Sequence, residues 1–480
     1  MRIDLRGASV FRGAGGTRGT PTPRAVRIVA CEALFAYRAW SMVINARRAA
    51  HVNLAIVALI LVSLAGCQER RTLATTPNIY LDGRGKDVFD AVPESLRTSD
   101  IEILYVTDRS IEKETKIGPK YGYKRDRDMT YGTATVSLTP QPTWEQLVKD
   151  STASPRSQRY ELDTTSIKEI GTFRSPLDRM EVKDNKIVLP PSALQQMRNE
   201  REHLRAVLEK RLAKTPRKDV FIYVHGFANT FDDAVFRSAE MWHFTGRIGV
   251  PIAYTWPAGS PGIFGYFHDR ESGEYTVSHF KQFLRYVKDI PSVERIHIIA
   301  HSRGTDVVTT ALRELNIMVV AKGEDPQKVL KIQTLVLASP DMDYEVFGQR
   351  FFAENLVMVP AQTVIYFSPN DKAIWFANWL FSGKSRVGGL SFSDFPQNLR
   401  KELSQLDRLQ FVSCKVSGHS TSHDYEFANP AVFSDLITLL QKGDGKQLAY
   451  QRPLEAALPG LWGIQNDYGL PEKKPSGQSN

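Results

Sequence analysis

Cysteine is scarce in this sequence. Only Cys31, Cys67 and Cys414 occur among 480 residues, which excludes a disulfide framework. Cys414 lies in a strand-like segment, where we expect a buried, inert thiol. The ten histidines lack the spacing of metal ligands, and neither an H-E-x-x-H motif nor a cysteine cluster is present. We therefore expect no metal centre and no other cofactor.

Acidic residues are outnumbered, since 62 Lys and Arg face 53 Asp and Glu for a net charge of +9. The excess is concentrated in residues 1–66, which carry nine arginines against only Asp4 and Glu32. Subtracting this net +7 from +9 leaves +2 for the rest of the chain. A nucleic-acid-binding surface would need its positive charge in the folded part. We therefore expect no nucleic-acid partner.

No apolar run reaches the ~20 residues that span a membrane comfortably. The most apolar stretch, Val52 to Leu64, follows Arg47 and Arg48, as in the signal segment of an exported protein. It ends in Leu64-Ala65-Gly66-Cys67, which resembles a bacterial lipobox. The resemblance implies a diacylglyceryl group on Cys67 and cleavage just before it. The alternative is an N-terminal membrane anchor that is never cut.

The surroundings of this segment refine the prediction. Gln68 follows Cys67, instead of the Asp that favours inner-membrane retention. We therefore expect a lipid-anchored protein of the bacterial envelope, on the periplasmic side of the outer membrane. Residues 1–41 are too long and too rich in Arg and Gly for an ordinary leader, whereas Met42 would begin one of normal length.

Short apolar runs alternate with segments of helical length through the second half of the chain. Continuous runs of this kind fit strands buried on both faces of a parallel sheet. The predicted strands are Val220–Val224, Ile252–Trp256, Ile296–Ala300, Ile332–Ala338, Thr363–Phe367 and Leu409–Val416. The predicted helices are Asp232–Gly246, Val277–Lys288, Thr305–Val320 and Phe433–Leu440. The alternation predicts an α/β fold with one open, mostly parallel sheet and helices on both faces.

The rest of the chain completes the expected organisation. Residues 1–66 form the leader, 67–95 a polar tether, 96–442 the α/β domain with its core at 218–440, and 443–480 a C-terminal tail. Within the domain, Ile101–Val106 and Tyr131–Leu138 are predicted strands. A further helix is predicted over Leu194–Leu212, whose leucines form an apolar stripe facing the core.

A nucleophile motif follows one of the predicted strands. Ala300-His301-Ser302-Arg303-Gly304 matches the G-x-S-x-G pattern of a nucleophile elbow, with Ala in the first position. Small residues flank the serine because Cβ atoms there would collide with neighbouring backbone. The motif stands between a buried strand and a helix start, where free amides favour a developing anion. This placement makes Ser302 the candidate nucleophile.

A second loop is expected to complete an oxyanion hole. Val220–Val224 is followed by His225-Gly226-Phe227, about where such a sheet supplies its other oxyanion donor. The backbone N–H of Phe227 or Ala228 would then join that of Arg303. The alternative is a turn glycine with a structural His225.

An acid and a base should follow the serine along the chain. Asp371 comes at the carboxyl end of a predicted strand, where active sites of open α/β sheets gather, and is the preferred acid. Asp341 and Asp343 follow the preceding strand and are the alternatives. Both His419 and His423 follow the last strand and could serve as the base. The residues alone do not separate them.

The stretch from about Lys218 to Leu440 resembles a bacterial α/β-hydrolase family of esterase/lipase-like proteins with otherwise unknown function. The matching motifs are Phe221-Ile222-Tyr223-Val224-His225-Gly226-Phe227, Tyr254-Thr255-Trp256-Pro257, Ala300-His301-Ser302-Arg303-Gly304, Leu337-Ala338-Ser339-Pro340-Asp341-Met342-Asp343 and Ser368-Pro369-Asn370-Asp371-Lys372-Ala373. The family's fixed spacing from its last His to a helix-opening Asp is matched by His423 and Asp435, twelve residues apart. The resemblance therefore favours His423, although the family's usual Gly-His pair occurs at Gly418-His419.

The resulting hypothesis is an esterase-like serine hydrolase that cleaves a small-molecule or lipid ester through an acyl-Ser302 intermediate. Aromatic residues such as Trp256, Phe264 and Trp375 could line an acyl cleft or belong to the ordinary core. A non-catalytic envelope lipoprotein that uses the same fold as a binding module is the rival hypothesis. An acyltransferase would share the acyl-serine intermediate.

Overall fold

The computed structural model describes residues 71–262, 264–380, 385–395, 397–403, 405–416, 423–442, 452–458 and 461–471. All of them lie in one unit of the chain, Arg70–Asn480. The predicted leader and Cys67 lie outside the described residues.

The described residues form an eleven-stranded sheet in the order β12-β13-β11-β10-β9-β8-β6-β7-β1-β2-β3, and a separate hairpin of β4 and β5. The strands are β1 (Ile101–Thr115), β2 (Gly118–Thr139), β3 (Glu161–Phe173), β4 (Glu181–Lys183), β5 (Lys186–Val188), β6 (Asp219–Val224), β7 (Val250–Thr255), β8 (Arg295–His301), β9 (Ile332–Ala338), β10 (Gln362–Phe367), β11 (Leu409–Cys414), β12 (Glu455–Leu458) and β13 (Leu461–Ile464). In this sheet order, each strand from β13 across to β1 is parallel to its neighbours. The sheet is extended by antiparallel strands at both edges, β12 at one and β2 and β3 at the other. The predicted α/β fold with an open, mostly parallel sheet is confirmed.

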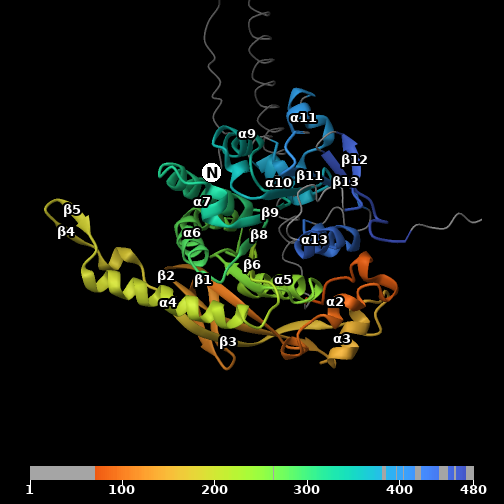
Figure 1. Ribbon diagram of the computed structural model, residues 1–480, viewed down its shortest axis with the longest axis horizontal. Helices are drawn as coiled ribbons and strands as arrows, with labels where there is room; N and C mark the ends of the chain where they lie inside the picture. The colour runs from red at the N-terminus through yellow and green to blue at the C-terminus, as the bar shows by residue number, and fades with distance from the viewer. Residues whose placement is uncertain are drawn as a thin grey trace, which may run out of the picture. The chain divides into compact units, whose positions relative to one another are not determined.

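Helices cover both faces of this sheet (Figure 1). They are α2 (Lys86–Asp90), α3 (Trp144–Ser151), α4 (Pro191–Leu212), α5 (Phe231–Phe244), α6 (Gly265–Lys288), α7 (Gly304–Val320), α8 (Pro326–Leu330), α9 (Tyr344–Gly348), α10 (Lys372–Leu380), α11 (Gln397–Leu403), α12 (Tyr425–Ala428) and α13 (Pro430–Lys442). On β8, Ile298 packs into the core layer that contains α6 and α7. Its neighbour Ile299 packs into the layer that contains α5 and α13. Adjacent residues face opposite layers, so the central strands need apolar residues at consecutive positions.

Residues 67–95 were predicted to be an irregular tether, and this prediction is wrong for residues 71–95, the part that the structure describes. Residues 71–95 contain η1 (Asn78–Gly83), α2 and η2 (Glu94–Leu96), and they pack against the domain. Phe89 is fully buried, and Tyr80 donates a hydrogen bond to the backbone oxygen of Phe244. This segment joins the fold because its few aromatic side chains fill the layer beneath α5, although its overall composition is polar.

The predicted C-terminal tail at residues 443–480 is also wrong in part. Strand β13 pairs in parallel with β11, and β12 pairs in antiparallel with β13, so these two short strands close one edge of the sheet. Arg452 forms an ion pair with Asp435 at 2.7 Å, and both side chains are fully buried. A charge at this depth needs such a partner, and the pair ties the C-terminal segment to α13.

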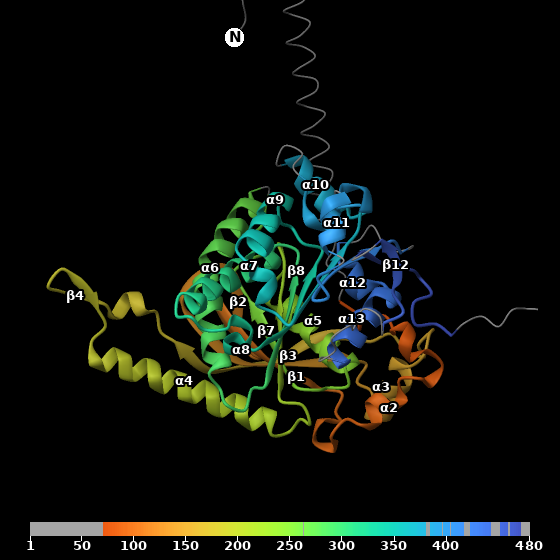
Figure 2. The same ribbon diagram turned by 45° about the horizontal axis from the view of Figure 1, so that its top comes forward.

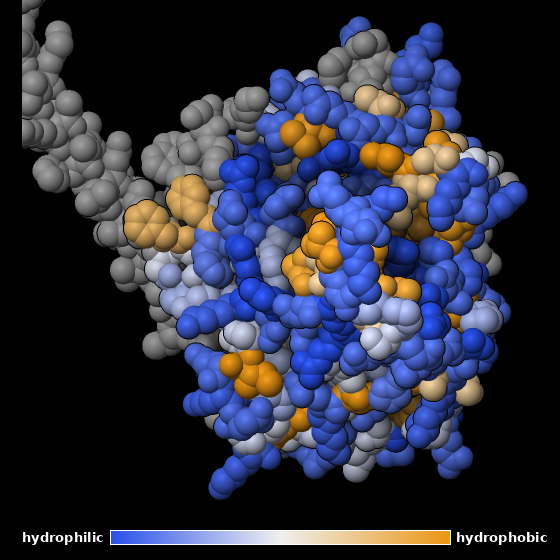
Figure 3. All heavy atoms as spheres, turned by 90° about the vertical axis from the view of Figure 1, so that its left-hand side faces the viewer, coloured by the Kyte–Doolittle hydropathy of each residue, from blue (hydrophilic) through white to orange (hydrophobic). Residues whose placement is uncertain are grey.

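The predicted apolar stripe of Leu194–Leu212 holds only for the second half of α4. Leu204, Leu208 and Leu212 are buried, whereas Leu194 is exposed. The first half of α4 and the β4–β5 hairpin extend away from the body (Figure 2). Seen from that side, the surface is mainly hydrophilic, with hydrophobic side chains gathered near the centre of the view (Figure 3). No helix among the described residues has the length and apolarity needed to cross a bilayer.

Candidate active site

Ser302 lies on a tight turn between β8 and α7. Its φ of 52° is in the left-handed region, which is strained for a residue with a Cβ. A Cβ on Gly304 would lie 2.4 Å from the carbonyl oxygen of His225, and one on Gly226 would lie 2.6 Å from Cβ of Ser302. Glycine is therefore required at both positions. This geometry is the physical reason for the small residues of the elbow motif.

His423 connects the serine to an acid. Its Nε2 lies 2.6 Å from Ser302 Oγ, and its Nδ1 lies 2.8 Å from Oδ2 of Asp371. The other carboxylate oxygen of Asp371 accepts the N–H groups of Ala373 and Ile374 at 3.0 and 3.1 Å. These bonds, made at the start of α10, fix the direction in which Asp371 presents its second oxygen to His423. The structure thus brings together the preferred nucleophile, base and acid.

The electrostatics of this cluster favour a protonated imidazole. Burial lowers the pKa of His423, but the charge and hydrogen bond of Asp371 outweigh it. The charges of Glu426 and Asp341 act in the same direction, and together these effects raise the pKa of His423 from 6.5 to about 9. The imidazolium that forms during proton transfer from Ser302 is therefore stabilised. The neutral, base form becomes dominant only above pH 9.

The alternative acids make other contacts. Asp341 accepts a hydrogen bond from the hydroxyl of Tyr266 at 2.8 Å and pairs with Arg386 at 2.6 Å. Asp343 caps the start of α9 by accepting two backbone N–H groups at 2.9 and 3.1 Å. Their carboxylates are thus committed to local partners, and it is Asp371 that bonds the ring of His423. The alternative base, His419, lies outside the described residues.

The candidate donors of the oxyanion hole are the backbone N–H groups of Phe227, Ala228 and Arg303, and they differ in whether they already have a hydrogen-bond acceptor. The N–H of Ala228 donates to Oδ2 of Asp269 at 3.1 Å, so it is already engaged. Among the described residues, the N–H groups of Phe227 and Arg303 have no hydrogen-bond acceptor. Arg303 precedes the first residue of α7, where the helix dipole adds positive potential. These two amides are therefore available to a developing anion.

Access to the serine is narrow. Ser302 is only 3% exposed, while the side chain of His423 is 26% exposed. Of the aromatic residues considered for an acyl cleft, Phe264 and Trp375 are exposed, at 75% and 65%. Trp256 is fully buried and is core.

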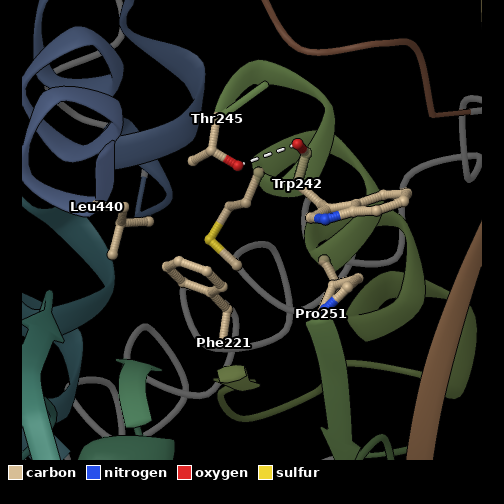
Figure 4. Close-up of a pocket in the computed structure, with 7 residues that line it drawn as sticks. Phe221, Trp242, Thr245, Pro251 and Leu440 are labelled. Atoms are coloured by element: carbon tan, nitrogen blue, oxygen red, sulfur yellow. Dashed lines mark hydrogen bonds between the residues drawn. The ribbon is translucent and has the colours of Figure 1, made fainter. Parts of the chain in front are cut away.

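A small pocket elsewhere in the domain lacks chemistry of this kind. It is lined mainly by apolar side chains of α5, β6, β7 and α13, and Figure 4 shows its lining (Phe221, Trp242, Thr245, Pro251 and Leu440). Phe221 pairs in register with His297, five residues before Ser302, so the pocket lies toward the opposite end of the strands. Among the described residues, no group of three or more His, Cys, Asp or Glu is arranged to hold a metal ion.

The sheet order and the sharp turn after β8 define an α/β-hydrolase fold. The chain belongs to the family of α/β hydrolases of unknown function, DUF900, whose model matches residues 200–441. No curated protein matches the sequence. Among solved structures, esterase Est22 is similar at 13% identity and a TM-score of 0.24, covering 52% of this chain and 89% of that one. Est22 with p-nitrophenol is similar at 11% identity and a TM-score of 0.20, covering 47% and 73%.

One group beside the nucleophile was not predicted from the sequence. His301 Nε2 lies 2.9 Å from the carbonyl oxygen of His423, and the two rings are 4.9 Å apart. Burial, together with the charge of His423, lowers the pKa of His301 to about 4, so its ring is neutral at neutral pH. The fully buried Glu426 lies 3.1 Å from the same nitrogen, and burial raises its pKa well above 4.5. The G-x-S-x-G motif accepts any residue before the serine, so the sequence did not indicate that His301 would contact the backbone of His423.

Proposed function

We propose that this chain is a serine hydrolase that cleaves acyl esters through an acyl-Ser302 intermediate. The observation that carries the proposal is the hydrogen-bonded series from Ser302 Oγ to His423 Nε2 at 2.6 Å and from His423 Nδ1 to Asp371 at 2.8 Å. A nucleophile, a base and an orienting acid in this geometry are what acyl transfer to serine requires. Membership of an α/β-hydrolase family is consistent with this chemistry.

The reaction proceeds in two halves. His423 Nε2 takes the hydroxyl proton of Ser302 while Oγ attacks the ester carbonyl carbon, and the carbonyl oxygen becomes an oxyanion. The N–H groups of Phe227 and Arg303 donate to that oxyanion, and Asp371 stabilises the imidazolium. The tetrahedral intermediate then collapses, and His423 gives its proton to the departing alkoxide. Water repeats the sequence on the acyl-serine, releasing the carboxylic acid and restoring Ser302.

The direct experiment is labelling with a fluorophosphonate probe, which reacts with activated serines. Wild type should be labelled at Ser302, and Ser302→Ala should not. Ser238→Ala is a matched control, because Ser238 is a buried hydroxyl in α5 that donates a hydrogen bond within its own helix, to Ala234 O at 2.9 Å. This control should be labelled like wild type. A folded wild type that stays unlabelled would overturn the proposal in favour of a binding module.

We further propose that the protein is a lipoprotein of the bacterial envelope, anchored through Cys67 on the periplasmic side of the outer membrane. The proposal is supported by the Leu64-Ala65-Gly66-Cys67 sequence after a short apolar run. A lipid anchor would hold the enzyme near small-molecule or lipid esters of the envelope. Metabolic labelling with an alkyne fatty acid should tag wild type and fail for Cys67→Ala. Equal labelling of both would refute lipidation at this residue.

A further inference from the structure

The loop that follows β6 has an unfavourable backbone conformation. We call Gly226–Asn229 the oxyanion loop, because it contains the candidate N–H of Phe227. Ala228 in this loop has φ of 59°, a left-handed conformation that disfavours residues with a Cβ. The side chain of Ala228 is exposed, so packing of its own methyl group does not hold it there. Within the loop, the N–H of Gly226 donates to Asn229 Oδ1 at 3.3 Å, and further contacts come from side chains outside the loop.

Arg109 reaches the oxyanion loop from β1. The pairing between β1 and β7 ends at Thr107, which lies opposite Thr255. Arg109 follows two residues later, just beyond the point where the two strands separate. The side chain is buried, at 3% exposed, and all five guanidinium N–H groups are bonded. The acceptors are Thr255 Oγ1 at 2.8 Å, Ala258 O at 2.7 Å, Gly122 O at 2.9 Å, Asn229 O at 2.9 Å and His225 Nε2 at 3.2 Å.

Asp269 reaches the same loop from the first turns of α6. It is fully buried, and its carboxylate accepts backbone N–H groups from two segments. Oδ2 accepts the N–H of Ala228 at 3.1 Å and that of Gly259 at 2.9 Å, while Oδ1 accepts that of Ser260 at 3.2 Å. The turn at Ala228 is thus held by a charge-assisted hydrogen bond.

The two side chains hold the same pair of segments through opposite backbone groups. Arg109 takes the carbonyls of residues 229 and 258, and Asp269 takes the N–H groups of residues 228 and 259. We infer that Arg109 and Asp269 are positioning residues that hold the oxyanion loop so that the N–H of Phe227 faces the substrate oxyanion. The inference rests on the proposed serine hydrolase function.

His225 completes the support as a neutral bridge. Its Nδ1 lies 2.9 Å from the carbonyl oxygen of Gly226, so Nδ1 carries the proton and Nε2 accepts from Arg109. Burial, reinforced by the nearby charge of Arg109, lowers the pKa of His225 well below 6.5. The ring stacks on Trp256 at 5.1 Å, and Trp256 Nε1–H donates to His225 O at 2.7 Å.

Arg109 remains charged despite its burial. Burial lowers its pKa from 12.5 to about 10, which is still well above neutral pH, and its bonded acceptors are all uncharged. The carboxylates of Asp108 and Asp269 lie near enough to counter the effect of burial and favour this charge, so the loop is held between two side chains of opposite charge.

The test compares Asp269→Asn and Arg109→Lys with wild type in ester hydrolysis. Rates are normalised to the concentration of active sites counted by fluorophosphonate labelling. A misdirected Phe227 amide should lower kcat by about 10²–10³, the loss typical of one oxyanion donor, with little change in KM. Affinity for a trifluoromethyl ketone, whose adduct with Ser302 carries an oxyanion, should fall by the same factor.

Asp435→Asn is the matched control. Asp435 is another fully buried carboxylate with several donors, but it lies on α13 and bonds Tyr366 and Arg452. It should lower the melting temperature while leaving kcat and the ketone affinity unchanged. If Asp269→Asn behaves like this control, the positioning role is refuted.

A milder variant covers the case in which both charged variants fail to fold. Thr255→Val has the same shape and removes only one acceptor of Arg109, at 2.8 Å. We expect an about three- to tenfold loss in kcat and in ketone affinity, as for one lost hydrogen bond. An unchanged kcat in folded Thr255→Val, with active wild type, would overturn the inference. A wild type that neither reacts with the probe nor hydrolyses esters would instead remove the proposed function and the inference together.

Discussion

The pH dependence of hydrolysis offers the sharpest test of the site, through the single change Asp371→Asn. In wild type, the pKa of His423 is raised from 6.5 to about 9, against the opposing effect of burial. This increase corresponds to about 3 kcal/mol of preference for the imidazolium, at about 1.36 kcal/mol per tenfold change in proton affinity. Asp371 is the largest of the causes that raise it. Without that charge, burial dominates and the pKa of His423 should fall below its ordinary 6.5.

The sign of the effect follows from which form of the imidazole works. Only neutral His423 can accept the Ser302 proton, so kcat/KM of wild type should rise with pH and level off above an apparent pKa near 9. In Asp371→Asn the rise should be complete below about pH 7, at a plateau lower by about 10³–10⁴, because the ring loses its orientation and the imidazolium its partner.

The assay is hydrolysis of a p-nitrophenyl ester at constant ionic strength from pH 5 to 10, with active sites counted by labelling.

Stability provides a second readout. A raised folded-state pKa of His423 stabilises the fold fully below about pH 6.5, and this contribution disappears as pH rises through about 9. The melting temperature of wild type should therefore exceed that of the variant most at low pH. A rate profile with the same apparent pKa in both proteins would refute the reasoning.

Three further changes have defined outcomes. Gly304→Ala places a Cβ 2.4 Å from a backbone oxygen, so thermal melting should show a loss of about 1–3 kcal/mol, together with loss of fluorophosphonate labelling. His301→Leu removes a bond to the backbone oxygen of His423 at 2.9 Å, and we expect an about tenfold lower kcat in steady-state kinetics. Arg452→Met leaves Asp435 buried without its cation, so urea unfolding should show a loss of about 3–5 kcal/mol without a change in kcat per active site.

The central strands could be predicted from the sequence because burial on both faces forces uninterrupted apolar runs. The predicted Ile332–Ala338 coincides with β9, and the other predicted strands of the central sheet differ by at most two residues at either end. The predicted Ile101–Val106 and Tyr131–Leu138 cover only part of β1 and β2, whose remaining residues are largely polar. Strands β12 and β13 were missed because each is four residues long, and β12 is largely exposed. The first half of α6 was missed because its residues are mostly polar, so its helical form depends on packing against the rest of the domain.

The candidate site was predictable only as far as chain order and strand ends allow. The elbow at Ser302 has a local cause in steric crowding, so its motif is visible in the sequence. Asp371 and Asp341 both follow strands, and only the directions of their side chains distinguish them. Asp269 left no signal, because its partners are backbone N–H groups brought close by tertiary structure.

The separation of these residues along the chain has a consequence for folding. Ser302 and His423 are 121 positions apart, and Asp371 stands 52 positions before His423. Contacts of such long range form late, because distant segments must first be brought together at an entropic cost. During refolding from denaturant, esterase activity should therefore return no earlier than the native tryptophan fluorescence of the chain. Hydrolysis would then report on completion of the whole sheet.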